Sequence, residues 1–239
     1  MDLTEATVVV TGASRGIGRA LLSAFADRDA AVVGCARDSE ALSAAVAEAE
    51  TAAGTAATVE GGVADVRGET AVERVMETAD GVGDTDGIDV LVANAGVNLG
   101  SAGESSIHEE PYDRFDDTLA TNLRGVFAST KAAIDRMPSS GRILVPSGSI
   151  AVDPKPGMGS YAVSKGAVEA LVRQLAVDAD QTAAVVDPGA VETGLADHGG
   201  RDPEDVAPMF VWAAATASAD EIDGERVDLR MWKRATHSR

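Results

Sequence analysis

Residues 7–18 read TVVVTGASRGIG, and this stretch decides how the chain folds. Its first four residues form an apolar run, the next eight are rich in glycine, and residues 19–25, RALLSAF, follow as a helix. A strand, a glycine turn and a helix in this order predict a nucleotide-binding unit, because glycine permits a tight turn and lets a pyrophosphate approach the N–H groups at a helix N-terminus. The spacing is neither G-x-G-x-x-G nor that of a P-loop, since no Lys-Ser or Lys-Thr pair follows the last glycine.

Apolar runs and helical repeats alternate along the rest of the chain. Buried parallel strands are predicted at residues 7–10, 31–35, 57–60, 90–93, 143–145, 183–186 and 226–229, of which 57–60 is the weakest and 226–229 is short. Apolar residues recur at helical spacing at positions 42, 46 and 49, at 72, 75 and 76, and at 168, 171, 172 and 175. A further helix is predicted over residues 203–217, with Asp202 as N-cap and Pro203 at its first position. Repeated βαβ units predict an α/β fold, a Rossmann-like doubly wound parallel sheet of about seven strands with helices on both faces.

A tyrosine and a lysine in the second half of the chain suggest a reactive site. Tyr161 and Lys165 are four residues apart, just over one helical turn, so their side chains would share a helix face. They follow a serine-bearing segment, residues 147–149. The spacing alone also fits an ordinary solvated helix, and it is the glycine turn near the other end of the chain that favours a shared site.

These motifs occur in a recognisable order. The ordered set is Thr-Gly-x-x-x-Gly-x-Gly at residues 11–18, Asn94-Ala95-Gly96, Asn122, Tyr161-x-x-x-Lys165 and Pro188-Gly189. In order and approximate spacing, over essentially the whole chain, the set resembles the short-chain dehydrogenase/reductase family, in its short single-domain branch. The resemblance implies one Rossmann-type domain over residues 1–239, with a coenzyme-binding half at 1–110 and a catalytic and substrate half at 111–239. Residues 81–87 are a predicted turn, and residues 98–110 are a predicted polar loop beside the coenzyme crevice.

The resemblance implies carbonyl–alcohol chemistry by hydride transfer, with Tyr161 as the acid/base. The pKa of a tyrosine hydroxyl, about 10, must fall to about 7 for proton transfer near neutrality, which corresponds to about 4 kcal/mol. An ammonium at about 5 Å contributes roughly 3 kcal/mol in an effective dielectric of about 20, so Lys165 is expected to supply most of the change. In the family this lysine also binds the nicotinamide ribose, and Asn122 supports a water relay to it.

The carbonyl-binding serine departs from the family pattern. The usual position, thirteen residues before the tyrosine, falls on Gly148. Alignment forward from residues 142–145 favours Ser147, whereas alignment back from residues 156–157 favours Ser149. We choose Ser149, so the predicted catalytic residues are Asn122, Ser149, Tyr161 and Lys165.

The charge pattern at the predicted coenzyme site favours NADP(H) over NAD(H). A carboxylate after the second strand would repel a 2′-phosphate, and this chain has Ala36 there. Arg37 and Arg15 are placed to bind that phosphate, although Arg37 could instead pair with Asp38. By resemblance, Asp65 would hold the adenine amine and Thr193 would reach the nicotinamide carboxamide. The predicted coenzyme-binding residues are Gly12, Ser14, Arg15, Gly16, Ile17, Gly18, Arg37, Asp65, Val66, Asn94, Ala95, Gly96, Tyr161, Lys165, Pro188, Gly189, Val191 and Thr193.

The composition disfavours several other classes of protein. The chain has 39 acidic and 20 basic residues, a formal net charge of −19, which disfavours nucleic acid and anionic membranes as partners and suggests a salt-loving host. Hydrophobic residues make up 45%, and no apolar stretch approaches a membrane span. The acidic N-terminus does not resemble a signal peptide, and the single cysteine, Cys35, suits a reducing cytoplasm. The three histidines at positions 108, 198 and 237 show no metal-ligand spacing, so no metal is expected.

The resemblance implies an NADP-dependent alcohol dehydrogenase, carbonyl reductase or 3-oxoacyl reductase that acts on a small carbonyl compound or alcohol. Ketones, 3-oxoacyl thioesters, sugars and steroids all stay open as substrates. Only residues 194–202, including Leu195 and His198, lie where relatives often carry a longer lid. We expect a homo-oligomer, a dimer or tetramer, although the chain end lacks the paired glycines often seen there. The alternative function is a catalytically silent NADP(H)-binding sensor or interaction protein, and a nucleotide-sugar epimerase is a weaker third.

Overall fold

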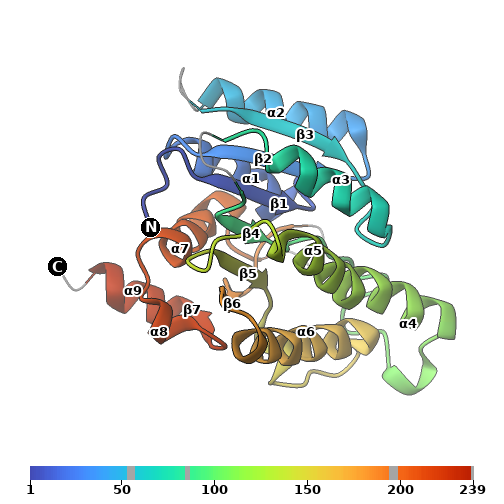
Figure 1. Cartoon of the computed structure of the whole chain (residues 1–239). Coiled ribbons are helices and arrows are strands. Elements are labelled where there is room, and N and C mark those ends of the chain that lie inside the picture. Colours follow the sequence, from blue (N-terminus) through green and yellow to red (C-terminus); the bar gives the residue numbers. More distant parts are fainter. Residues whose placement is uncertain (53–56, 84–86, 194–198, 238–239) are drawn as a thin grey trace.

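The computed structural model describes residues 1–52, 57–83, 87–193 and 199–237, and within them seven parallel strands form one sheet (Figure 1). In sheet order the strands are β3 (Val59–Val63), β2 (Ala31–Ala36), β1 (Thr7–Thr11), β4 (Val90–Val92), β5 (Arg142–Pro146), β6 (Thr182–Asp187) and β7 (Arg226–Asp228). The sheet confirms the predicted Rossmann-like doubly wound fold. Its order reverses between β1 and β4, where a crevice opens outside the carboxyl ends of the strands.

Helices connect successive strands. The α-helices are α1 (Gly16–Ala26), α2 (Ser39–Ala52), α3 (Glu69–Ala79), α4 (Tyr112–Leu119), α5 (Gly125–Ile134), α6 (Gly159–Asp178), α7 (Pro203–Ala215), α8 (Ala219–Ile222) and α9 (Leu229–His237). Two short 3₁₀ turns, η1 (Ile107–Glu109) and η3 (Ser149–Ala151), and one π-helical segment, η2 (Ala120–Arg124), complete the elements described.

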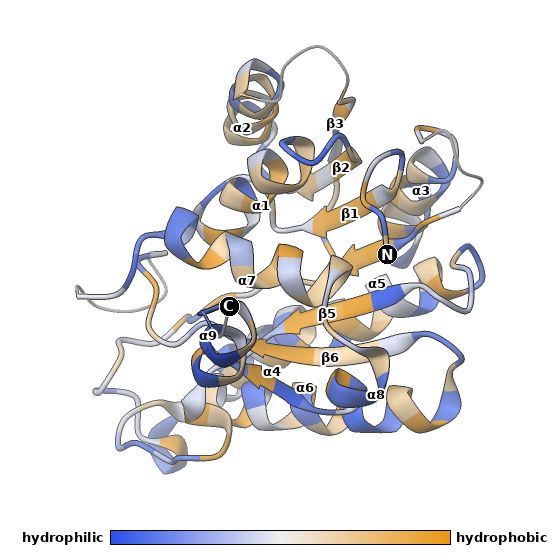
Figure 2. Cartoon of the chain, turned by 90° about the vertical axis from the view of Figure 1, so that its left-hand side faces the viewer, coloured by the Kyte–Doolittle hydropathy of each residue, from blue (hydrophilic) through white to orange (hydrophobic). Residues whose placement is uncertain are grey.

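The strands separate two hydrophobic cores. Val8 and Val10 of β1 point into a core with α1, α2 and α7, whereas Val9 points into the opposite core with α3, α5 and α6. Successive residues of a strand face opposite sides, so a strand buried on both faces is apolar throughout. Figure 2 shows this pattern, with hydrophobic strands inside and hydrophilic positions on the helices around them.

Several predicted boundaries differ from the structure. The strand expected at residues 57–60 is shifted to Val59–Val63, because parallel pairing of Gly61 and Gly62 with β2 extends it despite their lack of side chains. The strand expected at 226–229 ends at Asp228, whose Oδ1 accepts a hydrogen bond from Met231 N (2.7 Å), and the unpredicted helix α9 follows. Asp202 stands at the N-cap of α7, but its side chain makes no capping hydrogen bond there, and α7 ends two residues early. The polar loop at 98–110 contains η1, and residues 84–86 of the predicted turn lie outside the described residues.

A buried arginine ties the sheet to α7. Arg142 of β5 donates through Nη1 to the Ala213 carbonyl (2.6 Å) and through Nη2 to the Ala217 carbonyl (2.8 Å). These carbonyls lie at the C-terminal end of α7, where the helix leaves acceptors without an internal partner and the helix dipole favours a cation. Arg142 is therefore a connection between sheet and helix that apolar packing alone does not supply.

We expect Arg142→Met to destabilise the fold by about 2 kcal/mol, because it leaves two buried carbonyls without donors. For a chain of this size the melting temperature would fall by roughly 4–8 °C. Thermal unfolding followed by circular dichroism measures this, with Arg173→Met as the control because Arg173 is exposed on α6 and its loss changes net charge equally. Equal melting temperatures for the two variants would contradict the structural role of Arg142.

Candidate active site

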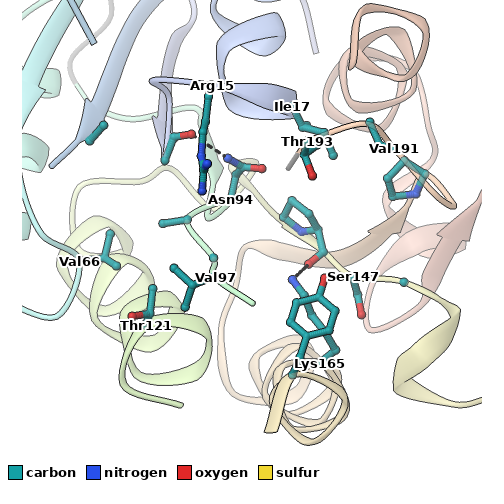
Figure 3. A pocket seen from close by; sticks show the side chains of 18 of the residues that line it. Arg15, Ile17, Val66, Asn94, Val97, Thr121, Ser147, Lys165, Val191 and Thr193 are labelled. Carbon is teal, nitrogen blue, oxygen red and sulfur yellow. Dashed lines mark hydrogen bonds between the residues drawn. The ribbon is translucent and has the colours of Figure 1, made fainter. Parts of the chain in front are cut away.

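A cavity of about 310 Å³ lies at the carboxyl ends of the strands, where the sheet order reverses. Figure 3 shows Arg15 with Asn94 on one side of it and Lys165 with Ser147 on another. The predicted residues that line the cavity are Gly12, Ser14, Arg15, Ile17, Arg37, Asp65, Val66, Asn94, Ala95, Gly96, Ser149, Tyr161, Lys165, Pro188, Gly189, Val191 and Thr193. Three predicted residues, Gly16, Gly18 and Asn122, are not part of its wall.

The glycines outside the wall are required by the shape of the turn. A Cβ on Gly18 would lie 2.2 Å from the Gly12 carbonyl oxygen, and one on Gly16 would lie 3.0 Å from the Thr193 side chain. Gly12 and Gly16 also have positive φ values, +68° and +55°, which favour glycine. Gly16 and Gly18 therefore let the turn close against its neighbours.

The N-terminus of α1 suits an anion. Arg15 occupies its N-cap with no side-chain hydrogen bond to the first turn, and Ser14, Arg15 and Ile17 line the cavity there. The first N–H groups of a helix have no intrahelical acceptor, and the dipole makes them a site for negative charge. The residues present therefore fit the pyrophosphate of a dinucleotide.

Asn94, after β4, holds the glycine turn in place. Its Nδ2 donates to the carbonyls of Thr11 (2.9 Å) and Gly12 (3.2 Å), and Ala95 N donates to Thr11 Oγ1 (3.0 Å). The side-chain amide thus joins the ends of β1 and β4 on either side of the reversal. Asn94 lines the cavity, as expected, but its hydrogen bonds go to the turn.

Arg15 and Arg37, the two arginines expected to bind the adenosine phosphate, are not paired with a carboxylate among the described residues. Asp38, the possible partner of Arg37, instead accepts hydrogen bonds from Glu40 N (3.1 Å) and Ala41 N (3.0 Å) at the start of α2. Both guanidiniums are exposed and line the cavity.

Asp65, after β3, is engaged by a neighbouring guanidinium. Arg67 Nη2 donates to its Oδ2 (2.7 Å) and Arg67 Nε to its Oδ1 (3.1 Å). The hydrogen bonds from Arg67 are the main reason that the pKa of Asp65 is lowered, although partial burial opposes them. The carboxylate lies on the cavity wall with part of its acceptor capacity already used.

Tyr161 and Lys165 lie on one face of α6, in its first two turns. Lys165 Nζ is 5.7 Å from the centre of the Tyr161 ring and donates to the Pro146 carbonyl (3.0 Å). Burial lowers the pKa of Lys165 to about 8, and the charge of Glu169 partly opposes this. The Tyr161 hydroxyl differs from expectation, because burial raises its pKa above the ordinary value.

Asn122 acts on the backbone of the neighbouring loop. Its side chain is only 2% exposed, in η2; its Oδ1 accepts from Val97 N (2.7 Å), and its Nδ2 donates to Val97 O (2.8 Å) and Ser164 Oγ (2.9 Å). A π-helical segment within a longer helix often marks a functional site. Asn122 thus fixes Val97, which lines the cavity, and joins that loop to α6.

The two candidate serines have different surroundings. Ser147 is buried, and its Oγ donates to Glu169 Oε1 (2.7 Å). Ser149 begins η3 and is exposed. Both line the cavity, but only the hydroxyl of Ser147 is held by a buried carboxylate.

Sequence reasoning missed part of the cavity wall. The additional lining residues include Val97, Thr121, Ile150, Lys155 and Ala190. Val97, Thr121 and Ile150 directly follow or precede predicted site residues, so chain proximity is the signal that would have found them. Lys155 carries no such signal, because only the folded loop after η3 brings it to the cavity. Leu195 and His198 of the expected lid lie outside the described residues.

None of the helices in the described part of the chain has the length and apolar content to span a bilayer.

Comparison with known proteins agrees with this geometry. A family model for short chain dehydrogenase matches residues 6–203. The chain is 34% identical over 212 residues to 3beta-hydroxysteroid dehydrogenase 1 of Eggerthella lenta, covering 85% of this chain and 77% of that protein. It is 33% identical over 201 residues to NADPH-dependent pterin aldehyde reductase of Arabidopsis thaliana, covering 79% and 76%.

Solved structures show the same similarity in three dimensions. A short chain dehydrogenase from Burkholderia cenocepacia, crystallised in complex with NADP, superposes with a TM-score of 0.82 at 27% identity and covers 95% of this chain and 97% of its own. The family model matches more than half of the chain, and the curated relatives exceed 30% identity. The chain belongs to the short-chain dehydrogenase family.

Proposed function

We propose that the chain is an oxidoreductase that interconverts a carbonyl and an alcohol by hydride transfer, prefers NADP(H), and uses Tyr161 as acid/base. The observation that carries the proposal is the placement of Tyr161 and Lys165 on one wall of a cavity that also includes the uncapped N-terminus of α1. A proton donor and an anion site in one cavity are what reduction of a carbonyl by a dinucleotide requires.

Tyr161, Ser149 and Lys165 would have different roles in the reaction. When bound, the coenzyme supplies or accepts the hydride. Tyr161 would donate its proton to the carbonyl oxygen as negative charge develops there, and its raised pKa keeps that proton on the hydroxyl before reaction. Ser149 would hold the same oxygen with its hydroxyl. Lys165, as an ammonium, would stabilise the tyrosinate left behind.

The preference for NADP(H) rests on Arg15 and Arg37. Both line the cavity, and within the described residues neither is used in an ion pair. Planar guanidiniums bind phosphate through paired hydrogen bonds, and Ala36 leaves no carboxylate at the end of β2 to repel it. The names of the Arabidopsis and Burkholderia proteins support this choice, since they mention NADPH and NADP.

We further propose that the enzyme works as a homo-oligomer in a salt-rich cytoplasm. Tyr112, 91% exposed on α4, and Phe127, 49% exposed on α5, are large apolar side chains of the kind that subunit contacts cover. The net charge of −19 and the single cysteine support the setting. Activity should therefore be measured in concentrated KCl.

Tyr161→Phe is expected to lower kcat for carbonyl reduction by about 10²- to 10⁴-fold, because it removes the proton donor. The assay follows loss of NADPH absorbance with a panel of ketones and aldehydes. Tyr112→Phe is the matched control, since it alters the other tyrosine of the chain at an exposed site. Tight NADPH binding without turnover on any carbonyl, unchanged in Tyr161→Phe, would favour the silent sensor.

Arg37→Ala is expected to raise the KM for NADPH by about 10- to 100-fold, because it removes a charge-assisted hydrogen bond to the 2′-phosphate. The KM for NADH should change little, as that coenzyme lacks the phosphate. Arg28→Ala, at an exposed arginine beyond α1, controls for the change in net charge. A wild-type KM for NADH equal to or below that for NADPH would refute the preference.

Single alanine substitutions should separate the two serines. Ser149→Ala is expected to lower kcat by about 10²- to 10³-fold, as loss of a donor to the developing oxyanion does. Ser147→Ala should lower kcat less than Ser149→Ala does, because it removes a hydrogen bond to the Glu169 carboxylate and no donor to the oxyanion. Steady-state kcat values measure both, and the reverse order of the two losses would assign the role to Ser147.

A further inference from the structure

At the cavity wall and directly behind it, charged side chains of three elements form one largely buried group. It consists of Lys165 and Glu169 of α6, Asp187 of β6 and Arg226 of β7, and we call it the charge cluster. Arg226 is paired with both carboxylates, through Nη2 with Glu169 and through Nη1 with Asp187 Oδ2 (2.7 Å). The Glu169 side chain is 5% exposed. Two cations and two carboxylates balance, so the cluster carries no formal net charge.

Glu169 connects α6 to both loops that border the reacting end of the cavity. Its Oε1 accepts a hydrogen bond from Ser147 (2.7 Å), two residues before Ser149. Through Arg226 it reaches Asp187, whose Oδ1 accepts from Gly189 N (3.0 Å) in the loop after β6. The Glu169 carboxylate is therefore connected by hydrogen bonds to both of these loops, directly to one and through Arg226 and Asp187 to the other.

Glu169 and Lys165 also hold adjacent residues. They are four residues apart on α6, so their side chains share a face. Lys165 donates to the carbonyl of Pro146, and Glu169 accepts from the next residue, Ser147. The end of β5 is thus held by one cation and one anion of the same helix.

The electrostatic surroundings of Lys165 make the carboxylate significant. Burial lowers the pKa of Lys165, and among charged neighbours the charge of Glu169 opposes that effect. Tyr161, on α6 as well, lies beside Lys165, and the other two residues of the charge cluster are Asp187 from β6 and Arg226 from β7. Glu110 accepts a hydrogen bond from Ser160 at the start of α6. Asp153 and Lys155 are exposed. Loss of Glu169 would remove the anion that opposes the effect of burial on Lys165, and it would leave Arg226 with its pairing to Asp187.

A buried ion pair is by itself weak evidence for stability, because desolvation of the charges offsets their attraction. The bonds of this cluster end on cavity-lining residues, namely Pro146, Ser147 and Gly189. We propose that Glu169 is a positioning residue of the active site: it holds the Ser147–Ser149 and Pro188–Gly189 loops against α6, and its charge balances Lys165. The inference rests on the function proposed above.

The direct test is titration of Lys165 by NMR. The chain has four lysines, so ¹³C-lysine labelling gives few Cε signals, and Lys165→Met assigns the relevant one. Lys165 should titrate with a pKa of about 8. It should titrate at lower pH in Glu169→Gln, which removes a neighbouring anion, and at higher pH in Arg226→Gln, which removes a neighbouring cation. Loosened packing alone would move both variants in the same direction, and that result, or no change in Glu169→Gln, would overturn the proposal.

The titration test can still be made if Glu169→Gln fails to fold. Glu169→Gln removes one of the two carboxylates paired with Arg226 and leaves Asp187, and the same substitution made in Arg226→Gln avoids that partly paired cation. Lys165 in the double variant should titrate below its value in Arg226→Gln alone. Equal values would contradict the balancing role of Glu169.

Kinetics supply the second readout. The charge of Lys165 is lost as pH rises through its pKa, so a lower pKa in Glu169→Gln should move the alkaline loss of reductase activity to lower pH. The kcat below that limb should fall by about 10- to 100-fold, as misplacement of reacting groups does. Asp178→Asn, which removes an exposed carboxylate bonded to Gln174 on the same helix, should change neither quantity.

The two proposals fail in different ways. Wild-type chain that turns over no carbonyl contradicts the proposed function, and the NMR comparison then decides alone on Glu169. Wild-type turnover matched by Glu169→Gln in kcat and in pH profile contradicts the positioning role alone.

Discussion

The close approach of the β1–α1 turn to the end of β4 is the constraint on which the site depends. Gly18 lies so near the Gly12 carbonyl that no side chain fits between them, and the Asn94 amide donates to the carbonyls of Thr11 and Gly12. The contact spans the point at which the sheet order reverses. It therefore places the N-terminus of α1 at the cavity, whose lining also includes the loops after β5 and β6.

The cavity is lined mainly by cationic side chains, although the chain as a whole is acidic. The chain is strongly acidic, yet the charged residues lining the cavity are Arg15, Arg37, Lys155 and Lys165, against one carboxylate, Asp65, which is engaged by Arg67. A cationic cleft in an acidic surface concentrates field lines and attracts anions. This suits a phosphorylated dinucleotide. On the side of the cavity formed by α6, burial raises the pKa of Tyr161 and lowers that of Lys165, so it favours the uncharged form of both groups.

Much of the fold was predictable because it depends on local pattern. Short apolar runs that alternate with helical repeats indicate buried parallel strands. Six of the seven strands begin within one residue of the prediction. The strand β3 was misplaced because Gly61 and Gly62 have low strand propensity, and only pairing with β2 makes them extended. The helix α9 was missed because a short polar segment has little local preference, and packing of Leu229, Met231 and Trp232 on the core stabilises it.

The sequence by itself determined the strand–turn–helix unit, the doubly wound sheet and the shared helix face of Tyr161 and Lys165, because glycine stereochemistry and residue periodicity act over a few residues. The tertiary structure alone decided that Ser147 is held by Glu169 and that Asn122 fixes the backbone of Val97. These partners are 22 and 25 residues apart along the chain. Hydrogen-bond partners and desolvation depend on which groups the fold brings together and buries, and the order of residues does not specify either one.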